Sequence, residues 1–357
     1  MRILISVLST ALSLAGAAAA EEKLQWSGEI AGELEAAVEK GDYQRVTSIM
    51  ILGGGDLVYE GYFNSASAET RHNTRSATKT INSMLIGAAI ADGDIKSVNE
   101  PIIKFFRDKR PFENPDKRKN AIKIEDIMTM SSPLECDDWN QFSRGNEERM
   151  YLVEDMAQFY FDLPIRGFPV WSPPPEKQPY GRAFSYCTAG AQLVGWIAAR
   201  AAKEDLEAYA QRRLFTPLGI ETVTWPRTGA GDVMAAGGLE LTTTMLARLG
   251  QLFLNDGEWN GEQILPKTWI KESLQPRAKV DEVTEYGYLW WLSRYEVNGV
   301  SHPVAYMSGN GGNRVIIMPD HELVVVVTKT SYNTRGMHET TQALSDDFIV
   351  KNIRVTP

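Results

Sequence analysis

The segment Arg75-Ser76-Ala77-Thr78-Lys79 opens a strongly apolar stretch of this 357-residue chain. Lys79 follows Ser76 by three residues, so on a helix the two side chains share a face. A neutral lysine there could take the hydroxyl proton and make Ser76 a nucleophile, and the positive end of the helix dipole would favour the alkoxide. The alternative is an N-capping serine beside a solvated lysine. Apolar side chains at spacings of three and four predict a helix beginning at or just before Ser76: Ile81, Met84, Leu85 and Ala88.

Strand patterns lie on both sides of this helix in the sequence. Residues 46–52 and 57–63 are rich in apolar and alternating side chains around a glycine turn at 53–56, which predicts a β-hairpin. A last amphipathic helix is expected over residues 337–350, with three apolar side chains toward the sheet: Leu344, Phe348 and Ile349. Four further strands are expected before it: residues 288–293, 304–308, 314–318 and 323–329.

The middle of the chain has a mainly helical pattern. Its loop at 168–181 carries five prolines with Trp171 and Tyr180, so it could wall a cleft or be a plain surface loop. We therefore expect an α+β fold, with one antiparallel sheet from residues 21–75 and 275–357 and a mainly helical insertion over 76–274. The active site is expected where the two parts meet. Five helices are expected in the insertion after the first: residues 124–130, 147–162, 189–203, 205–215 and 243–255.

Composition and charge narrow the class of protein. With 43% hydrophobic and 23% charged residues, the chain has the composition of a globular protein. Its formal charge is -9, and its basic residues form no block that could follow a phosphate backbone, so we expect no nucleic-acid partner. Beyond the N-terminal segment, no apolar run reaches the roughly 18 residues of a membrane span, so we expect no integral membrane association.

The N-terminus indicates export. Arg2 precedes an apolar run and a series of alanines that ends at Ala20, which is typical of a secretory signal peptide over residues 1–20 with cleavage near Ala20. The expected location is the periplasm or the outside of the cell. Cys136 and Cys187 are an even pair that suits such an oxidising compartment. A disulfide and two buried thiols both remain open, because the sequence supplies no geometry.

Metal and cofactor motifs are missing from the sequence. The four histidines are dispersed, and neither they nor the two cysteines have the spacing of a zinc site. There is no phosphate-binding lysine loop, no dinucleotide fingerprint and no Gly-x-Ser-x-Gly elbow. We expect neither a metal nor a cofactor.

The order of the motifs resembles a family of serine hydrolases, that of the class C β-lactamases, penicillin-binding peptidases and related esterases. The resemblance covers nearly the whole chain after residue 20 and implies a β-lactamase/transpeptidase-like fold. Its nearest branch is that of the 6-aminohexanoate-dimer hydrolases. The segments that resemble the family are 57–63, 75–79, 122–132, 237–239 and 286–291, and those that resemble the branch are 136–138, 145–148 and 184–190.

The resemblance also implies the site residues. Ser76 would be the nucleophile, Lys79 its base, and Tyr186 the relay of a proton to the leaving group, although a structural tyrosine is the alternative. The backbone amides of Ser76 and Asn310 would form the oxyanion hole, while residues 309–313 could equally be only a hairpin turn. The predicted substrate-binding residues are Thr188, Ser308, Gly309 and Trp171.

Two departures from the family pattern bear on the substrate. Thr188 stands where the family has an asparagine, so amide recognition of an acyl side chain is lost. Met307 stands where the family has lysine or histidine, and methionine cannot pair with a substrate carboxylate. The resemblance therefore implies an acyl-enzyme hydrolase of small esters or linear amides. The alternative is a catalytically silent protein that binds a cell-wall fragment or peptide.

Overall fold

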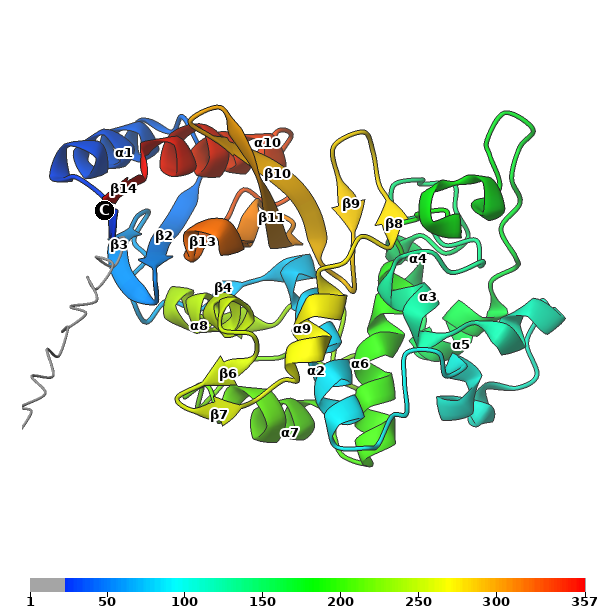
Figure 1. Ribbon diagram of the computed structural model, residues 1–357. Coiled ribbons are helices and arrows are strands. Elements are labelled where there is room, and N and C mark those ends of the chain that lie inside the picture. The colour runs from blue at the N-terminus through cyan, green and yellow to red at the C-terminus, as the bar shows by residue number, and fades with distance from the viewer. Residues whose placement is uncertain (1–22, 357) are drawn as a thin grey trace, which may run out of the picture.

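The computed structural model describes residues 23–356, so the predicted signal peptide at 1–20 lies outside the described residues. Its centre is an eight-stranded antiparallel sheet in the order β3-β2-β13-β12-β11-β10-β9-β8 (Figure 1). The N-terminal hairpin of β2 (Val46–Gly53) and β3 (Asp56–Tyr62) pairs directly with β13 (Leu323–Lys329). The expected sheet built from both ends of the chain is confirmed.

The other sheet strands follow the predicted order near the C-terminus. β10 begins three residues later than expected, because residues 287–290 form a turn before Trp291. The remaining strands of the large sheet are β8 (Ala278–Lys279), β9 (Glu285–Tyr286), β10 (Trp291–Val297), β11 (Val300–Gly309) and β12 (Asn313–Met318). The short pairs outside it are β1 (Lys23–Gln25) with β14 (Arg354–Thr356), β4 (His72–Asn73) with β5 (Glu240–Leu241), and β6 (Glu258–Trp259) with β7 (Glu262–Gln263).

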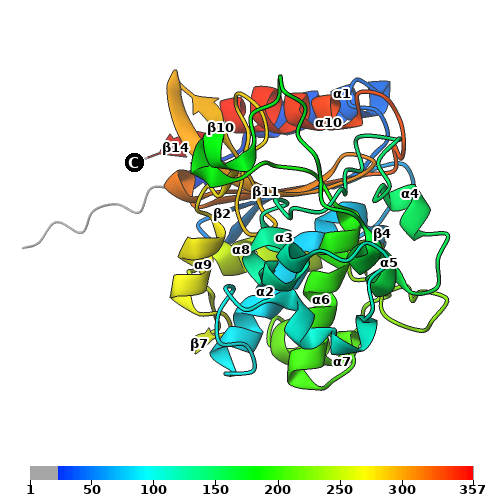
Figure 2. The ribbon, with the colours of Figure 1, turned by 90° about the vertical axis from the view of Figure 1, so that its right-hand side faces the viewer.

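One face of the sheet is covered by helices from the two ends of the chain. These are α1 (Gly28–Lys40) and α10 (Met337–Gln342), which continues as a π-helix over Ala343–Val350 (Figures 1 and 2). Leu34 and Leu344 are fully buried against this face with β-branched side chains of β2 and β13. The predicted C-terminal helix is confirmed, whereas α1 was not predicted.

The other face of the sheet packs against the helical part. α8 (Thr243–Leu254) lies on β12 and β13, and Gly250 allows the approach, because a Cβ there would lie 2.7 Å from Val324. α2 (Thr78–Ala91) and α6 (Thr188–Ala202) lie side by side below it (Figure 1). One continuous core joins these helices to the sheet, and Ile81, Leu193 and Val326 are all buried in it. Because the core is shared, it does not mark a boundary between the two parts, and the limits predicted for the sheet part and the helical part stay a prediction.

The helical part differs from the prediction at two places. The expected helix over 147–162 is two helices, α4 (Glu147–Met150) and α5 (Met156–Asp162), because the Asp155 carboxylate accepts a hydrogen bond from the Gln158 amide and starts α5 anew. The other expected helices are present, and α9 was not predicted. Their bounds are α3 (Ile124–Met128), α7 (Leu206–Ala210) with a π-helical turn over Gln211–Phe215, and α9 (Lys267–Ser273).

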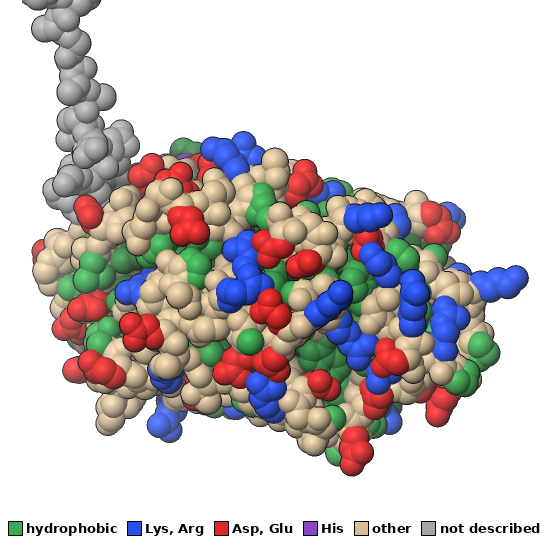
Figure 3. Space-filling view, turned by 90° about the horizontal axis from the view of Figure 1, so that it is seen from below, with side chains coloured by type: hydrophobic (Ala, Val, Ile, Leu, Met, Phe, Trp, Pro, Cys, Tyr) green, Lys and Arg blue, Asp and Glu red, His purple; other side chains and the backbone are tan. Residues whose placement is uncertain are grey.

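The surface carries charges of both signs. On the face in Figure 3, basic and acidic side chains are interspersed, with apolar side chains between them. Among residues 23–356, no helix combines the length and the apolar character of a membrane span.

Candidate active site

Ser76 lies in a tight turn between β4 and α2. Arg75, Ser76 and Ala77 form one turn of 3-10 helix, and Arg75 has a left-handed backbone with φ of 50°. The turn is tied down by Thr74, whose hydroxyl donates to the Leu239 carbonyl at 2.8 Å. The neighbouring β4–β5 ladder holds the same two segments together. Ser76 is therefore fixed at the start of the helix that the sequence predicts, with its side chain partly exposed.

Lys79 faces Ser76 from the first turn of α2. Its Nζ lies 2.8 Å from Ser76 Oγ and 2.9 Å from the Ala236 carbonyl oxygen, and the side chain is 2% exposed. Within the described chain, Lys79 has no carboxylate within ion-pair distance. The Nζ of Lys79 therefore lies within hydrogen-bond distance of the Ser76 hydroxyl, which is the arrangement that a serine nucleophile and its base require.

Tyr186 lies close to Lys79. It directly precedes Cys187, the disulfide-bonded residue before α6. The Lys79 Nζ lies 5.3 Å from the centroid of the Tyr186 ring. The ring packs against two tryptophans that also contact each other, with Trp139 nearly parallel at 5.7 Å and Trp291 at the same distance. The structure thus brings Ser76, Lys79 and Tyr186 together.

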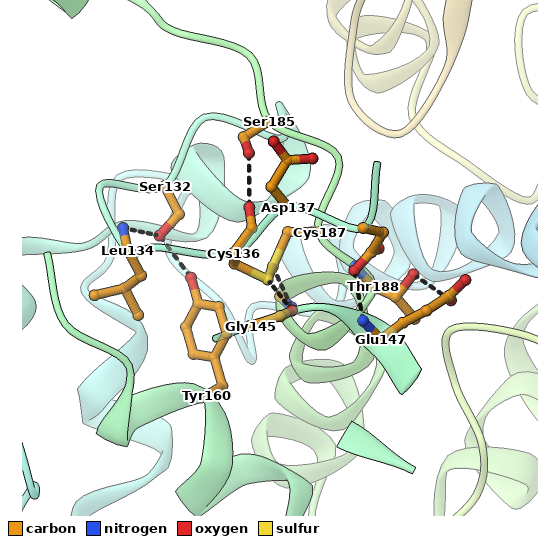
Figure 4. Close-up of a disulfide and its surroundings, with 12 residues drawn as sticks. Ser132, Leu134, Cys136, Asp137, Gly145, Glu147, Tyr160, Ser185, Cys187 and Thr188 are labelled. Carbon is orange, nitrogen blue, oxygen red and sulfur yellow. Dashed lines mark hydrogen bonds between the residues drawn. A yellow bond between two sulfur atoms is a disulfide. The ribbon is translucent and has the colours of Figure 1, made fainter. Parts of the chain in front are cut away.

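A disulfide lies directly beside this tyrosine. Cys136 and Cys187 are bonded, with their Cα atoms 5.3 Å apart (Figure 4). The question that the sequence leaves open is therefore answered in favour of the bridge. The Asp138 amide donates to the Tyr186 carbonyl at 2.9 Å, so the segment after Cys136 runs along the segment that carries the tyrosine. Ser185 adds a hydrogen bond from its hydroxyl to the Cys136 carbonyl at 2.6 Å.

Two carboxylate side chains, those of Asp138 and Glu147, contact Thr188. The Asp138 carboxylate accepts hydrogen bonds from the amides of Thr188 and Glu147 at 2.7 and 2.9 Å. The Thr188 hydroxyl donates to the Glu147 carboxylate at 3.0 Å (Figure 4). Burial raises the pKa of Asp138 to about 6, with a further rise from the negative charge of Glu147, whereas the positive charge of Lys79 acts in the opposite direction.

Sequence reasoning assigned no role to this carboxylate pair. Asp138 and Glu147 stand in segments that resemble the family, yet nothing in their spacing indicates that they meet at Thr188. Thr188, a predicted substrate-binding residue, is itself 1% exposed, and its hydroxyl donates to Glu147. Its side chain is therefore not open to a ligand.

The predicted oxyanion turn follows β11. Gly309 packs so closely on the Thr74 carbonyl that a Cβ would collide with it, and the same position lies 3.3 Å from the Ala77 amide nitrogen. The end of β11 is therefore pressed against the turn that carries Ser76. Within the described chain, the Asn310 amide donates no hydrogen bond, as expected of a group that serves a ligand.

The remaining predicted site residues divide between the cleft and its surroundings. Ser308 precedes Gly309 on β11 and is partly exposed, whereas Met307 is fully buried in the core. Trp171 is 84% exposed, and no ring contact joins it to the aromatic group around Tyr186. The prediction that Trp171 lines the substrate site is therefore not supported by its position. Trp139, which is 63% exposed, and Trp291 both stack on Tyr186 beside the site.

The proline-rich loop that carries Trp171 is anchored at its end. Arg182 forms ion pairs of 2.7 Å with Glu125 and Asp126 of α3, and the Tyr180 hydroxyl donates to Glu285 of β9. Among the described residues, no three metal-ligating side chains gather into a metal-binding group.

Comparison with known proteins places this geometry in a family. The profile of the Beta-lactamase family matches residues 34–346. The 6-aminohexanoate-dimer hydrolase of Paenarthrobacter ureafaciens is 23% identical over 278 residues, which cover 71% of this chain and 66% of that protein, so the chain spans just under two thirds of the length of this relative.

Two solved structures show the shared fold. A D-stereospecific amidohydrolase from Streptomyces aligns with a TM-score of 0.63 and 16% identity, covering 88% of this chain and 97% of the other. A class C beta lactamase from Rhodobacter sphaeroides aligns with a TM-score of 0.61 and 16% identity, covering 90% of this chain and 99% of the other. The chain belongs to the beta-lactamase family.

Proposed function

We propose that the protein is an exported serine hydrolase that cleaves small esters or linear amides through an acyl-enzyme on Ser76. The observation that carries the proposal is the distance of 2.8 Å between Ser76 Oγ and the Nζ of a buried lysine, Lys79. Family membership and the similarity to a 6-aminohexanoate-dimer hydrolase support the same reaction class.

The proposed reaction has two steps. Ser76 Oγ attacks the substrate carbonyl while Lys79, with Tyr186, receives the hydroxyl proton. The amides of Ser76 and Asn310 stabilise the negative oxygen of the tetrahedral intermediate. When the bond to the leaving group breaks, Tyr186 returns a proton to that group. Water then attacks the acyl-enzyme, and Ser76 recovers its proton as the acid leaves.

The environment of the site favours an uncharged substrate group. Met307 is buried in the core where the family has a lysine or histidine, so that position offers no cation to a substrate carboxylate. Beside Tyr186, the exposed ring of Trp139 offers an apolar surface. An ester or a linear amide suits these surroundings better than a carboxylate-bearing β-lactam.

The test compares three substrates and three proteins. Hydrolysis of a short-chain p-nitrophenyl ester, a 6-aminohexanoate linear dimer and nitrocefin is measured with the wild type, Ser76→Ala and Ser83→Ala. Ser83 is a matched control, because it is a buried serine of the same helix whose hydroxyl has no hydrogen-bond partner among the described residues. We expect ester or amide turnover in the wild type and in Ser83→Ala, and a loss of roughly a thousandfold or more in Ser76→Ala.

Each other outcome has a defined meaning. Nitrocefin as the preferred substrate would contradict the substrate class but not the nucleophile. Turnover that survives in Ser76→Ala would contradict the nucleophile. The absence of turnover and of labelling by a fluorophosphonate probe would favour the silent binding protein.

Export is the second part of the proposal. It is supported by the signal-like sequence of residues 1–20, and a disulfide suits an oxidising compartment. The intact mass of the protein in the periplasmic or secreted fraction tests it, and we expect a chain that begins at Glu21. A chain that retains residues 1–20 and stays in the cytoplasm would contradict export.

A further inference from the structure

The turn that carries the Asn310 amide is built mostly from glycine. Residues 309–313 contain three glycines, and each is required by a close neighbour. Gly309 lies on the Thr74 carbonyl, and a Cβ at Gly311 would lie 2.7 Å from the Tyr332 ring. A Cβ at Gly312 would lie 2.5 Å from the Thr341 hydroxyl. Glycine permits this packing, but it leaves the backbone of the turn with much conformational freedom.

Side chains outside the glycines must therefore hold the turn in shape. Gly312 accepts a hydrogen bond from the Thr341 hydroxyl at 2.8 Å, which fixes the far end of the turn. The Asn310 side chain exchanges hydrogen bonds with Asn333, donating to its side-chain oxygen at 2.7 Å and accepting from its amide at 2.9 Å. Both of these partners belong to the segment after β13.

Asn313 is the residue that holds the backbone of Asn310 itself. Its Nδ2 donates to the Asn310 carbonyl at 2.9 Å, and its Oδ1 accepts from the Lys329 amide at 3.0 Å. The side chain is 3% exposed; its hydrogen bond with the Lys329 amide is buried, and its hydrogen bond with the Asn310 carbonyl is partly buried. One amide thus links the turn to the neighbouring strand β13, and Asn313 begins the strand β12 that lies between β11 and β13.

We propose that Asn313 is a positioning residue for the oxyanion hole, which holds the Asn310 amide toward Ser76 through this pair of hydrogen bonds. The inference rests on the proposed function. Asn313 does not touch the substrate; it acts through the orientation of the Asn310 backbone. Its loss would let the glycine turn relax, so a donor would no longer be aimed where negative charge develops in the transition state.

The test uses one chemical change at two neighbouring positions. Asn313→Asp keeps the oxygen that accepts from Lys329 but replaces the donor to Asn310 with a carboxylate oxygen that repels its carbonyl. Asn333→Asp is the matched control on the exposed side of the same turn, because its oxygen still accepts from the Asn310 side chain. Asn313→Ser removes the amide without adding a buried charge, and it serves if the Asp variant does not fold.

The readouts are kcat and KM for the ester and the inhibition constant of phenylboronic acid, whose tetrahedral serine adduct imitates the intermediate. We expect both Asn313 variants to lose roughly 10- to 100-fold in kcat, with KM within about threefold. The boronic acid should bind more weakly by a similar factor. A merely structural role would lower the active fraction, and hence the rate, without changing this inhibition constant.

The inference and the proposed function fail in different ways. Wild-type kcat and boronic acid affinity in a folded Asn313 variant would overturn the inference while leaving Ser76 as the nucleophile. An equal loss in Asn333→Asp would also overturn it, because the effect would not depend on the bond to the Asn310 backbone. A wild type without Ser76-dependent turnover would overturn the proposed function, and the inference with it.

Discussion

Asp138 is a buried carboxyl group beside the site whose protonation is altered by its surroundings. Its pKa is raised to about 6, first by burial and then by the nearby charge of Glu147. The folded protein therefore binds the proton of Asp138 more tightly than the unfolded chain does. Its contribution to stability is fully present below pH 4 and is lost as the pH rises through 6.

The substitution Asp138→Asn tests this linkage. Asparagine places an NH2 group, which cannot accept, against the amide of Thr188 or Glu147, whereas the hydroxyl oxygen of a protonated Asp138 keeps a lone pair for that hydrogen bond. At pH 4 we expect the wild type to be the more stable protein by roughly 1–3 kcal/mol. The difference should shrink between pH 4 and pH 7, because only the wild type pays for ionising a buried carboxyl group.

Urea unfolding of both proteins at several pH values measures the free energy of unfolding. A difference that stays constant from pH 4 to pH 7 would contradict the raised pKa of Asp138. A difference that grows with pH would reverse the sign of the linkage.

The site also shows, residue by residue, what local sequence predicts. Ser76 and Lys79 were predictable because three residues of helix fix their relative position without help from the rest of the fold. Tyr186 follows Ser76 by 110 positions, and only the resemblance to a family indicated that it belongs to the site. Trp171 was predicted from its place in a proline-rich loop that could wall a cleft, and its exposed fraction of 84% shows that such a loop pattern does not place a side chain.

At the scale of elements, the disulfide joins two segments that flank the site. Cys136 and Cys187 are 51 residues apart in sequence, and the bridge fixes the loop after Cys136 to the start of α6. Tyr186 lies directly before the bridged Cys187, and its carbonyl accepts from Asp138. The bridge therefore restricts both the unfolded chain and the position of the tyrosine.

The double substitution Cys136→Ser/Cys187→Ser should affect stability and turnover together. A loop of this length corresponds to a loss of about 4 kcal/mol in the free energy of unfolding. We also expect kcat to fall by roughly tenfold, because Tyr186 loses a covalent anchor at its neighbour. Thermal unfolding and ester hydrolysis of the same preparations measure the two effects. A destabilised variant with unchanged kcat would contradict the positioning role of the bridge.

The strong periodic elements were predictable, and the weak or interrupted ones were not. The hairpin of β2 and β3 and the strand β13 are confirmed because their apolar patterns belong to a single buried sheet. β8 and β9 have two residues each, which is too short for any period to be recognised. The break between α4 and α5 depends on the cap at Asp155, a local hydrogen bond that competes with a continuous helical pattern.

At the scale of the whole molecule, two histidines, the buried His72 and the partly buried His338, make the fold sensitive to acid. Burial lowers the pKa of His72 and of His338 to about 4. Within the described residues, His72 Nε2 and His338 Nδ1 have no hydrogen-bond partner, so a proton gained there would find no acceptor. Both side chains are held neutral by the folded structure.

The sign of this effect is opposite to that of Asp138. A lowered pKa means that the folded state binds fewer protons than the unfolded state, so stability is present above pH 6.5 and is lost as the pH falls toward 4. Each histidine costs up to about 3 kcal/mol over this range. On acidification, the stability lost through the two histidines exceeds the stability gained through Asp138. We therefore expect a lower melting temperature at pH 4.5 than at pH 7.5.

The double substitution His72→Gln/His338→Gln removes both titrating groups. It measures how much of the pH dependence of the melting temperature these two histidines cause. Its melting temperature should depend less on pH between 7.5 and 4.5 than that of the wild type, even if it is lower at pH 7.5. An unchanged pH dependence would assign the acid sensitivity to other groups.

The central claim for the whole molecule is that Ser76 and Lys79 work as nucleophile and base. Mass spectrometry of the adduct with a fluorophosphonate probe tests it most directly, with the wild type, Lys79→Met and Lys119→Met. Lys119 is a matched control, because it is a fully buried lysine whose Nζ donates to the Phe161 carbonyl at 2.6 Å.

We expect one adduct, on the peptide that contains Ser76, in the wild type and in Lys119→Met. The rate of its formation should fall by roughly a hundredfold or more in Lys79→Met. An adduct on another residue, no adduct in the wild type, or an equal loss of rate in both lysine variants would contradict the account.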